Sequence, residues 1–344
     1  MSQKQLLLII FTSYYLFIMM IHTPAQLEAK INEAIDALDF DREPISLFQP
    51  IQYILSLGGK RLRPILAYMA TNLFSGDLSP TTAPAIGLEI FHNFSLLHDD
   101  LMDNAWVRRG AKTVHTKWCA NTAILSGDAM LIDAYNYMLK VDKDALPRIL
   151  RVFNTTAMQV CEGQQFDMDF EKRLHVKETE YLEMIRLKTA VLVAASLKIG
   201  AIMGNANDDD ADRLYEFGIN IGLAFQLKDD LLDVYGNPKE FGKNIGGDIL
   251  CNKKTFLLIK ALENSNELQE ATLQHWISAE TFDPEAKINA VKEIYDELKL
   301  DVLVEKLIQK YYLAALQCLS EVNVLDERKQ QLLIYTNELM KREK

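Results

Sequence analysis

The chain has 344 residues, of which 49% are hydrophobic and 25% are charged, so it can form one large globular domain or two of ordinary size with a substantial core. Its formal net charge of −11 argues against a nucleic-acid partner, because phosphate backbones are bound through clustered lysine and arginine. An acidic total does not exclude phosphorylated small molecules, since a few basic residues and bound cations can reverse the local charge.

The N-terminal stretch 6–21 is almost wholly apolar and follows a weakly basic start. It is shorter than the roughly 20 residues that a membrane-spanning helix needs, and no small-x-small cleavage site follows it. Three interpretations stay open: translation begins at Met19 or Met20, the stretch is a membrane anchor, or it is a secretion signal. We therefore separate an apolar extension, 1–24, from a single predicted domain, 25–344. The four widely spaced cysteines favour free thiols in a reducing compartment, and a cytoplasmic location is expected.

Helical periodicity dominates residues 25–344, and no run of alternating strand-like segments interrupts it. In chain order, the predicted helices are 25–38, 45–57, about 64–74, 79–103, 121–139, 145–170, 177–203, 208–235, 255–263, 284–320 and 326–341. Two polar loops that carry glycine, 104–117 and 237–252, separate some of them. Many long helices without a linker predict an all-α fold, a single large helical bundle.

One acidic pattern occurs twice, in the segments LLHDDLMD and QLKDDLLD, and each copy ends a predicted helix. Residues four apart share a helix face, so Asp99 projects with Asp103 and Asp229 with Asp233, and His92 lies on the first of these faces. Gathered carboxylates repel one another unless they are protonated or bridged by cations, and hard oxygen ligands suit Mg²⁺. One copy alone could be a solvated helix end, whereas two copies predict a magnesium site.

Basic residues complement these carboxylates. The segment GGKRLRP places cations and backbone N–H groups at a loop-to-helix junction, where anions bind well. Arg108 and Arg109 follow the first acidic copy, and arginine suits forked contacts with phosphate oxygens. Lys188, Lys243 and Lys253 lie in or beside apolar or glycine-containing stretches. Each could be an ordinary surface charge, but as a set they predict binding of a phosphorylated substrate.

Six segments, GGKRLRP, HNFSLLHDDLMDNAWVRRG, GDAML, LKTA, FQLKDDLLD and GKNIGGD, stand in the order typical of one enzyme family. The chain resembles the trans-isoprenyl diphosphate synthases, which include farnesyl, geranylgeranyl and longer polyprenyl diphosphate synthases, over roughly residues 25–344. The resemblance implies an all-α bundle around a deep central cavity, usually homodimeric. It also implies a Mg²⁺-dependent reaction that joins isopentenyl diphosphate to an allylic diphosphate, head to tail.

The resemblance also implies roles for individual residues. The Mg²⁺ ligands would be Asp99, Asp100, Asp103, Asp229, Asp230 and Asp233. Arg108 would hold the allylic diphosphate, and Lys60, Arg63, His92 and Arg109 the isopentenyl diphosphate. Lys188, Thr189 and Gln226 would be catalytic groups beside the nascent carbocation, with Lys243 and Lys253 lining the allylic diphosphate. One departure is the segment NKKTF, where many members have a glycine and a following proline.

The length of the product depends on the helix below Asp99. Ser95, Phe94 and Phe91 precede that aspartate by four, five and eight residues, which places them roughly 6, 7.5 and 12 Å beneath it. Small Ser95 leaves room, and the two phenylalanines either narrow the tunnel or are ordinary core residues. In having an aromatic residue five positions before the first aspartate, the chain resembles the short-chain members of this family. We expect a C15–C20 product, with geranylgeranyl favoured.

Four other functions would each account for part of this pattern. A terpene cyclase would have a different second metal motif, rich in Asn, Ser and Glu, and would not need GGKRLRP for a second diphosphate. A non-catalytic regulatory subunit would typically lack one acidic copy, whereas both are intact here. A longer-chain synthase would tend to have a small residue at position 94. A membrane-tethered binding protein rests on residues 6–21 alone.

Overall fold

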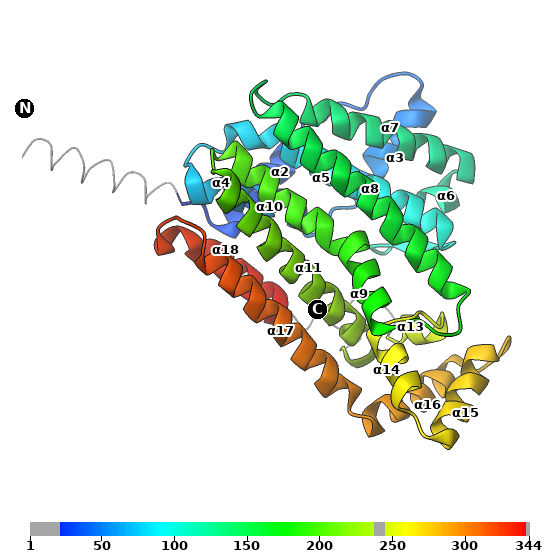
Figure 1. The fold of residues 1–344 in the computed structure, drawn as a ribbon. Coiled ribbons are helices and arrows are strands. Elements are labelled where there is room, and N and C mark those ends of the chain that lie inside the picture. Colours follow the sequence, from blue (N-terminus) through cyan, green and yellow to red (C-terminus); the bar gives the residue numbers. More distant parts are fainter. Residues whose placement is uncertain (1–20, 237–244, 342–344) are drawn as a thin grey trace, which may run out of the picture. The chain divides into compact units, whose positions relative to one another are not determined.

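A computed structural model describes residues 21–236 and 245–341. This part of the chain is helical apart from one two-stranded hairpin and the connecting segments, which confirms the predicted all-α fold (Figure 1). It forms two compact units, which are described separately. Of the described residues, the first unit comprises 21–155, 195–215 and 321–335, and the second comprises 156–194, 216–236, 245–320 and 336–341.

The first unit is built around α5, whose central turns are buried on nearly every side. A helix that is apolar all round needs neighbours on all sides, and α5 packs along α4 and α7 and also contacts α2 and α3 (Figure 1). The elements wholly inside this unit are α2 (Pro24–Asp36), α3 (Ile45–Ser56), α4 (Leu62–Phe74), α5 (Ser79–Met102), β1 (Val107–Arg108), β2 (Ala111–Lys112), α6 (Val114–Lys117) and α7 (Ala120–Met138).

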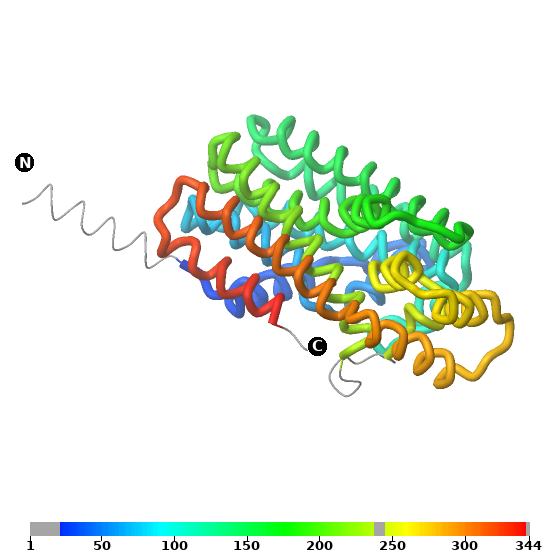
Figure 2. The backbone as a smooth tube through the Cα atoms, turned by 60° about the horizontal axis from the view of Figure 1, so that its bottom comes forward, coloured from blue at the N-terminus to red at the C-terminus, as the bar shows by residue number. Residues whose placement is uncertain are grey.

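The described elements that lie wholly inside the second unit come from the later part of the chain. They are α9 (Glu178–Ile185), a π-helical segment η1 (Arg186–Ala190), α13 (Gly247–Leu250), α14 (Phe256–Asn264), α15 (Glu267–Ser278), α16 (Pro284–Glu297) and α17 (Leu300–Ser320). Helix α14 contacts α9, α16 and α17, and α15 lies beside α16, as the yellow and orange segments of Figure 2 show. Four further helices begin in one unit and end in the other: α8 (Leu146–Glu171), α10 (Val191–Met203), α11 (Asp208–Tyr235) and α18 (Asp326–Lys341).

Several predicted boundaries need correction. The predicted loop 104–117 contains the hairpin and α6, and the predicted helix 177–203 is divided by the π-helical segment. The predicted helix 284–320 breaks after Leu298, because Lys299 has a left-handed backbone (φ 53°). Helix α15 lies where no helix was predicted.

Most of the apolar stretch 6–21 lies outside the described residues, so the predicted extension 1–24 and single domain 25–344 stay predictions. The first described helix begins at Pro24 and is capped reciprocally by Thr23 and Gln26. Within residues 21–236 and 245–341, no helix combines the length and the apolar character that crossing a bilayer requires.

Candidate active site

The first acidic cluster lies at the C-terminal end of α5. Asp99 and Asp100 are in its last turn, and Asp103 is the C-cap residue. Asp103 is exposed, Asp99 is half-buried and Asp100 is buried. Arg108 donates from Nε to both carboxylate oxygens of Asp100 at 2.8 Å, and its Nη2 lies 2.7 Å from Oδ1 of Asp100 and 3.8 Å from Oδ2 of Asp99. Burial raises the pKa of Asp100, while the Arg108 guanidinium opposes that rise.

A tight hairpin presents Arg108 to these carboxylates. Val107 pairs with Lys112 and Arg108 with Ala111, and the two turn residues between them are Arg109 (φ 53°) and Gly110 (φ 75°). Two successive positive φ angles are typical of a type I′ turn, whose twist matches that of antiparallel strands. The polar residues after α5 therefore form a defined structure instead of an open loop.

Arg109 extends from the same turn to the glycine loop before α4. Its Nη1 donates to the carbonyl oxygen of Gly58, and a Cβ added to Gly59 would come within 2.6 Å of its Nη2. Gly58 and Gly59 both have positive φ angles, 72° and 131°, so this loop needs glycine for its backbone and for the approach of Arg109. Exposed Lys60 follows in the same loop. The structure therefore brings GGKRLRP and the Arg108–Arg109 pair together.

His92 and Arg63 form a second basic contact in the first unit. Nη1 of Arg63 lies 3.2 Å from Nε2 of His92. A guanidinium can only donate, so Nε2 is the acceptor and the imidazole is neutral. Burial lowers the pKa of His92 well below its ordinary value, and the charges of Arg63, Arg109, Arg108 and Arg61 lower it further.

Arg61, in the middle of GGKRLRP, is buried and faces the protein. Its Nη1 lies 2.7 Å from Oε1 of Glu89, and its Nη2 donates to the carbonyl oxygen of Leu55 at 2.8 Å. This buried pair joins the start of α4 to α5, so Arg61 supports the fold rather than offering its charge to a substrate.

The residues predicted to limit chain length belong to an aromatic cluster. The ring centroids of Phe91 and Phe94 are 5.5 Å apart, and that of Phe91 is 5.2 Å from Phe153. Ser95 donates from Oγ to the carbonyl oxygen of His92 at 2.8 Å. Both phenylalanines are buried, which is compatible with core packing and with a tunnel floor, so their effect on chain length stays a prediction.

The second acidic cluster lies in the last turns of α11. Asp229 and Asp233 are half-buried, whereas Asp230 is buried. The hydroxyl of Tyr181 donates to Oδ2 of Asp230 at 2.5 Å, and Nε2 of Gln226 donates to Oδ1 at 2.9 Å. Burial raises the pKa of Asp230 to about 7, with the Lys253 charge opposing and the Asp248 charge adding to the rise.

The π-helical segment η1 carries two of the predicted catalytic residues. Nζ of Lys188 lies 2.6 Å from Oδ2 of Asp167 on α8, and Oγ1 of Thr189 donates to Oε1 of Gln226 at 3.0 Å. Thr189, Gln226, Asp230 and Tyr181 therefore form one continuous hydrogen-bonded chain in the second unit. π-helical insertions are frequent at functional sites because they alter the direction of the side chains they carry.

Lys253 and Asp233 both contact Asp248 of the short helix α13. Nζ of Lys253 lies 3.6 Å from Oδ1 of Asp248, and Oδ2 of Asp233 accepts from the backbone N–H of Asp248 at 2.9 Å. Burial acts to lower the pKa of Lys253, but the carboxylates around it, Asp248 first, raise it overall. The predicted site residue Lys243 lies outside the described residues.

Three residues of this arrangement were not predicted: Tyr181, Asp167 and Asp248. Asp248 ends the segment GKNIGGD, so its position was visible as part of a motif. Tyr181 precedes Lys188 by seven residues, about two helical turns, which could have indicated a shared face. Asp167 lies in a polar stretch that gave no signal.

The side chains present fit a divalent cation. In the described parts of the chain, no three His, Cys, Asp or Glu side chains form a preformed metal site. Mg²⁺ seldom needs one, because it retains several waters and takes substrate phosphate oxygens as further ligands. Asp99 and Asp103 in the first unit, and Asp229 and Asp233 in the second, have half-buried or exposed carboxylates, which are the hard oxygen donors that such an ion prefers.

Comparisons with known proteins agree with this geometry. The chain is 39% identical to the geranylgeranyl diphosphate synthase of Saccharolobus solfataricus over 290 residues, 82% of this chain and 86% of that protein. A crystal structure of a geranylgeranyl pyrophosphate synthase superposes with a TM-score of 0.89 at 42% identity, covering 93% of this chain and 99% of that one.

A second solved structure contains ligands. It is the geranylgeranyl pyrophosphate synthase from Corynebacterium glutamicum complexed with isoprenyl diphosphate and magnesium, which gives a TM-score of 0.82 at 26% identity over 93% of this chain and 98% of that one. The family model described as polyprenyl synthetase matches residues 45–298, about three quarters of the chain. The chain belongs to the polyprenyl synthetase family.

Proposed function

We propose that this protein is a trans-prenyltransferase that condenses isopentenyl diphosphate with an allylic diphosphate, head to tail. The observation that carries the proposal is the pair of acidic helix ends, each with its own basic partner. Arg108 lies beside Asp99 and Asp100, and Lys253 lies beside Asp248 near the second cluster. Membership of the polyprenyl synthetase family and relatives named geranylgeranyl diphosphate synthase support the same reaction.

The reaction separates charge and then forms a carbon–carbon bond. The C–O bond of the allylic diphosphate breaks, giving an allylic cation and a diphosphate. The double bond of isopentenyl diphosphate attacks that cation, and a proton then leaves to the departed diphosphate. The product is five carbons longer, and one diphosphate is released. Apolar surroundings exclude water, which would otherwise capture the cation.

The proposal gives each basic residue a role. In the first unit, Arg108 binds the allylic diphosphate, and Lys60, Arg63, His92 and Arg109 bind isopentenyl diphosphate. In the second unit, Lys188 and Lys253 bind diphosphate oxygens. Because His92 is neutral, it orients a substrate oxygen or Arg63 instead of adding charge. The Thr189 hydroxyl and the Gln226 amide present dipoles to the cation, and both are fixed by their mutual hydrogen bond.

Mg²⁺ is the proposed cofactor, with Asp99 and Asp103 as ligands in the first unit and Asp229 and Asp233 as ligands in the second. Asp100 and Asp230 complete the two clusters. When bound, it would neutralise the diphosphate and so make it a better leaving group. Asp100 and Asp230 already accept hydrogen bonds from Arg108 and from Tyr181 and Gln226. They therefore also hold their neighbouring aspartates in place.

The proposed product is geranylgeranyl diphosphate. The bulky Phe94, five residues before Asp99, and the names of similar proteins support a short chain. A longer-chain synthase would elongate further from the same primers.

We further propose a homodimer in the cytoplasm, with membrane contact only if the apolar stretch 6–21 is native. Leu125, Ile132 and Leu139 are 61%, 63% and 53% exposed and follow one another at seven-residue spacing along α7. Such spacing forms one apolar stripe on a helix, which suits the same stripe of a second copy.

The test is incubation of the purified full chain with Mg²⁺, isopentenyl diphosphate and, in separate reactions, C5, C10 and C15 allylic primers. We expect elongation that stops at C20, and no product with EDTA in excess of metal. Failure to elongate any primer would refute the proposal, whereas products well beyond C20 would refute only the chain length.

A further inference from the structure

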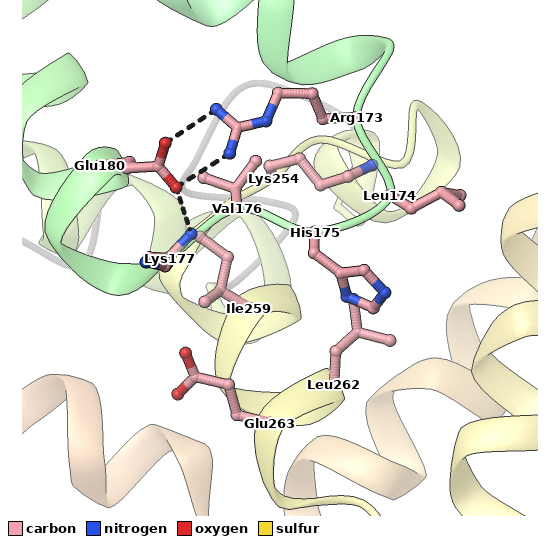
Figure 3. A pocket seen from close by; sticks show the side chains of 10 residues that line it. All are labelled: Arg173, Leu174, His175, Val176, Lys177, Glu180, Lys254, Ile259, Leu262 and Glu263. Carbon is pink, nitrogen blue, oxygen red and sulfur yellow. Dashed lines mark hydrogen bonds and ion pairs between the residues drawn. The ribbon is translucent and has the colours of Figure 1, made fainter.

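A pocket of about 460 Å³ lies in the second unit, between the segment that follows α8 and helix α14 (Figure 3). One wall is the stretch from Arg173 to Lys177 with Glu180 of α9, and the other is Lys254 with Ile259, Leu262 and Glu263. Its volume is in the range of small-molecule sites. None of the groups proposed for prenyl transfer lines it.

The charge of this pocket is positive, although the chain as a whole is acidic. Both lining carboxylates have cationic partners: Glu180 accepts two 2.9 Å hydrogen bonds from Arg173, and Glu263 lies 2.6 Å from Nζ of Lys260, which Glu178 shares at the same distance. Among the described residues, no carboxylate lies within ion-pair distance of Lys177 or Lys254. Three lining cations, Arg173, Lys177 and Lys254, stand against two lining carboxylates, so the lining has one positive charge in excess.

Lys254 is the least expected of these groups, because it is only 7% exposed. Its Nζ donates to the carbonyl oxygen of Asn252 at 3.2 Å, which satisfies one of three N–H donors. Burial lowers its pKa, and only the more distant charge of Glu171 opposes that change. A buried cation is costly unless an anion compensates it, and the side chain faces the pocket (Figure 3).

The backbone explains why Lys254 is held there. The N–H of Thr255 bonds to the carbonyl oxygen of Lys253 at 2.8 Å, and the Thr255 side chain caps α14 by accepting from the N–H of Leu258. In this extended segment Lys253 turns to Asp248, while Lys254 turns to the pocket. Two consecutive lysines thus serve different environments, which the segment NKKTF alone does not reveal.

Both walls also carry apolar residues. Leu174 is 77% exposed at the rim, and Val176, Ile259 and Leu262 continue the apolar surface inward. An exposed leucine near the ammonium of Lys254 and the imidazole of His175 combines hydrophobic contact with hydrogen-bond donors. This combination fits a molecule that has an anionic head and an aliphatic part.

We propose that this pocket is a second binding site, separate from the acidic clusters, for a phosphate ester with an aliphatic chain. The phosphate would accept hydrogen bonds from Lys254 and His175, and the chain would lie on Leu174 and Leu262. A phosphate monoester carries nearly two negative charges at neutral pH and three acceptor oxygens, so it compensates the buried ammonium of Lys254 and accepts its hydrogen bonds better than a carboxylate does.

The test uses decyl phosphate below its micellar concentration, titrated calorimetrically into the full chain with EDTA present. We expect Lys254→Met to raise the dissociation constant at least tenfold, whereas Lys254→Arg, which keeps the charge, should retain most of the affinity. The matched control is Lys172→Met, at an exposed lysine outside the pocket, which should change the dissociation constant less than twofold. Thermal unfolding of each variant checks the fold, which methionine should preserve because it replaces a buried cation with an apolar chain of similar length.

Three comparisons separate this site from others. Arg63→Met, which alters the proposed isopentenyl diphosphate site, should still bind decyl phosphate with the affinity that Lys254→Met loses. Inorganic phosphate and decanoate should each bind at least tenfold more weakly than decyl phosphate. Equal affinity for Lys254→Met and the unmodified chain would overturn the proposal. So would an equal loss in Lys172→Met, or decanoate binding as tightly as decyl phosphate. None of these results depends on whether the protein transfers prenyl groups.

Discussion

The hydroxyl of Tyr181 donates a 2.5 Å hydrogen bond to Oδ2 of Asp230, and both side chains are buried. Gln226 binds the other oxygen of that carboxylate and is itself held by Thr189. The middle aspartate of the second acidic cluster is therefore fixed from two sides. Its neighbours Asp229 and Asp233 are positioned by the same helix, so Tyr181 would support the proposed metal binding without touching the metal.

Replacing Tyr181 with phenylalanine should remove this hydrogen bond and leave the buried Oδ2 unsatisfied. An unmade hydrogen bond to a buried group costs about 1–3 kcal/mol, so we expect a lower unfolding temperature and a several-fold to tenfold higher Mg²⁺ concentration for half-maximal activity. Calorimetry and activity as a function of Mg²⁺ concentration would measure both effects.

The control for this variant is Tyr68→Phe. Tyr68 is also buried, and its hydroxyl bonds to Oγ1 of Thr82 at 3.1 Å in the first unit. It should lose a comparable amount of stability while its Mg²⁺ requirement stays unchanged. An equal shift in Mg²⁺ requirement for both variants would show that Tyr181 acts through general stability alone.

The two adjacent arginines of the hairpin should affect different substrates. Arg108→Lys loses the forked contact with Asp100, and Arg109→Lys loses the contact with the Gly58 carbonyl. Losing one charge-assisted hydrogen bond costs about 1.5–3 kcal/mol, which corresponds to substrate binding that is roughly tenfold weaker or more. We expect a higher KM for the allylic substrate in the first variant and for isopentenyl diphosphate in the second. Identical kinetic changes would contradict the assigned roles.

Phe94→Ala should give a longer product, because the tunnel floor would move away from Asp99. The substitution also leaves a cavity, and such cavities cost about 3–5 kcal/mol for a buried phenylalanine, so a less stable protein is expected. Chromatography of the dephosphorylated prenyl alcohols measures chain length directly. Phe217→Ala, a buried phenylalanine of α11 in the second unit, should be similarly destabilised with chain length unchanged. An unchanged product from Phe94→Ala would leave core packing as its only role.

A charge in the α7 stripe should disrupt the proposed dimer. Ile132→Asp places a carboxylate in the middle of Leu125, Ile132 and Leu139, and desolvating it at an interface is unfavourable. We expect the molar mass from light scattering to fall from two copies to one at micromolar concentration. Leu268→Asp, at an isolated exposed leucine of α15, should not change the mass. An unmodified chain that is monomeric would itself refute the dimer.

Long helices were predicted well because their apolar periodicity is strong. The prediction 208–235 coincides with α11, and 326–341 with α18. Breaks without glycine or proline were not predicted: Lys299 adopts a left-handed backbone that its residue type does not announce. Helix α15 could have been found, since Asn266 and Gln269 form a capping box at its start.

The candidate site was predicted in part for similar reasons. Helical spacing placed Asp99 with Asp103 on one helix end, because four residues make nearly one turn. The partners of the two middle aspartates depend on tertiary contacts instead: Arg108 reaches Asp100 through a hairpin, and Tyr181 reaches Asp230 from another helix. Spacing within one helix carries no information about such contacts.

Two glycines, one in α8 and one in α11, lie against the backbone of the π-helical segment η1. A Cβ at Gly163 of α8 would lie 2.3 Å from the backbone nitrogen of Lys188, and one at Gly222 of α11 would lie 2.5 Å from Cα of Ala190. Neither glycine has a reactive group, yet the two determine how closely α8 and α11 approach the backbone of η1. A single methyl group at either position would displace the amine and hydroxyl of Lys188 and Thr189. The positions of the groups proposed to act in the reaction therefore depend on two residues that have no side chain at all.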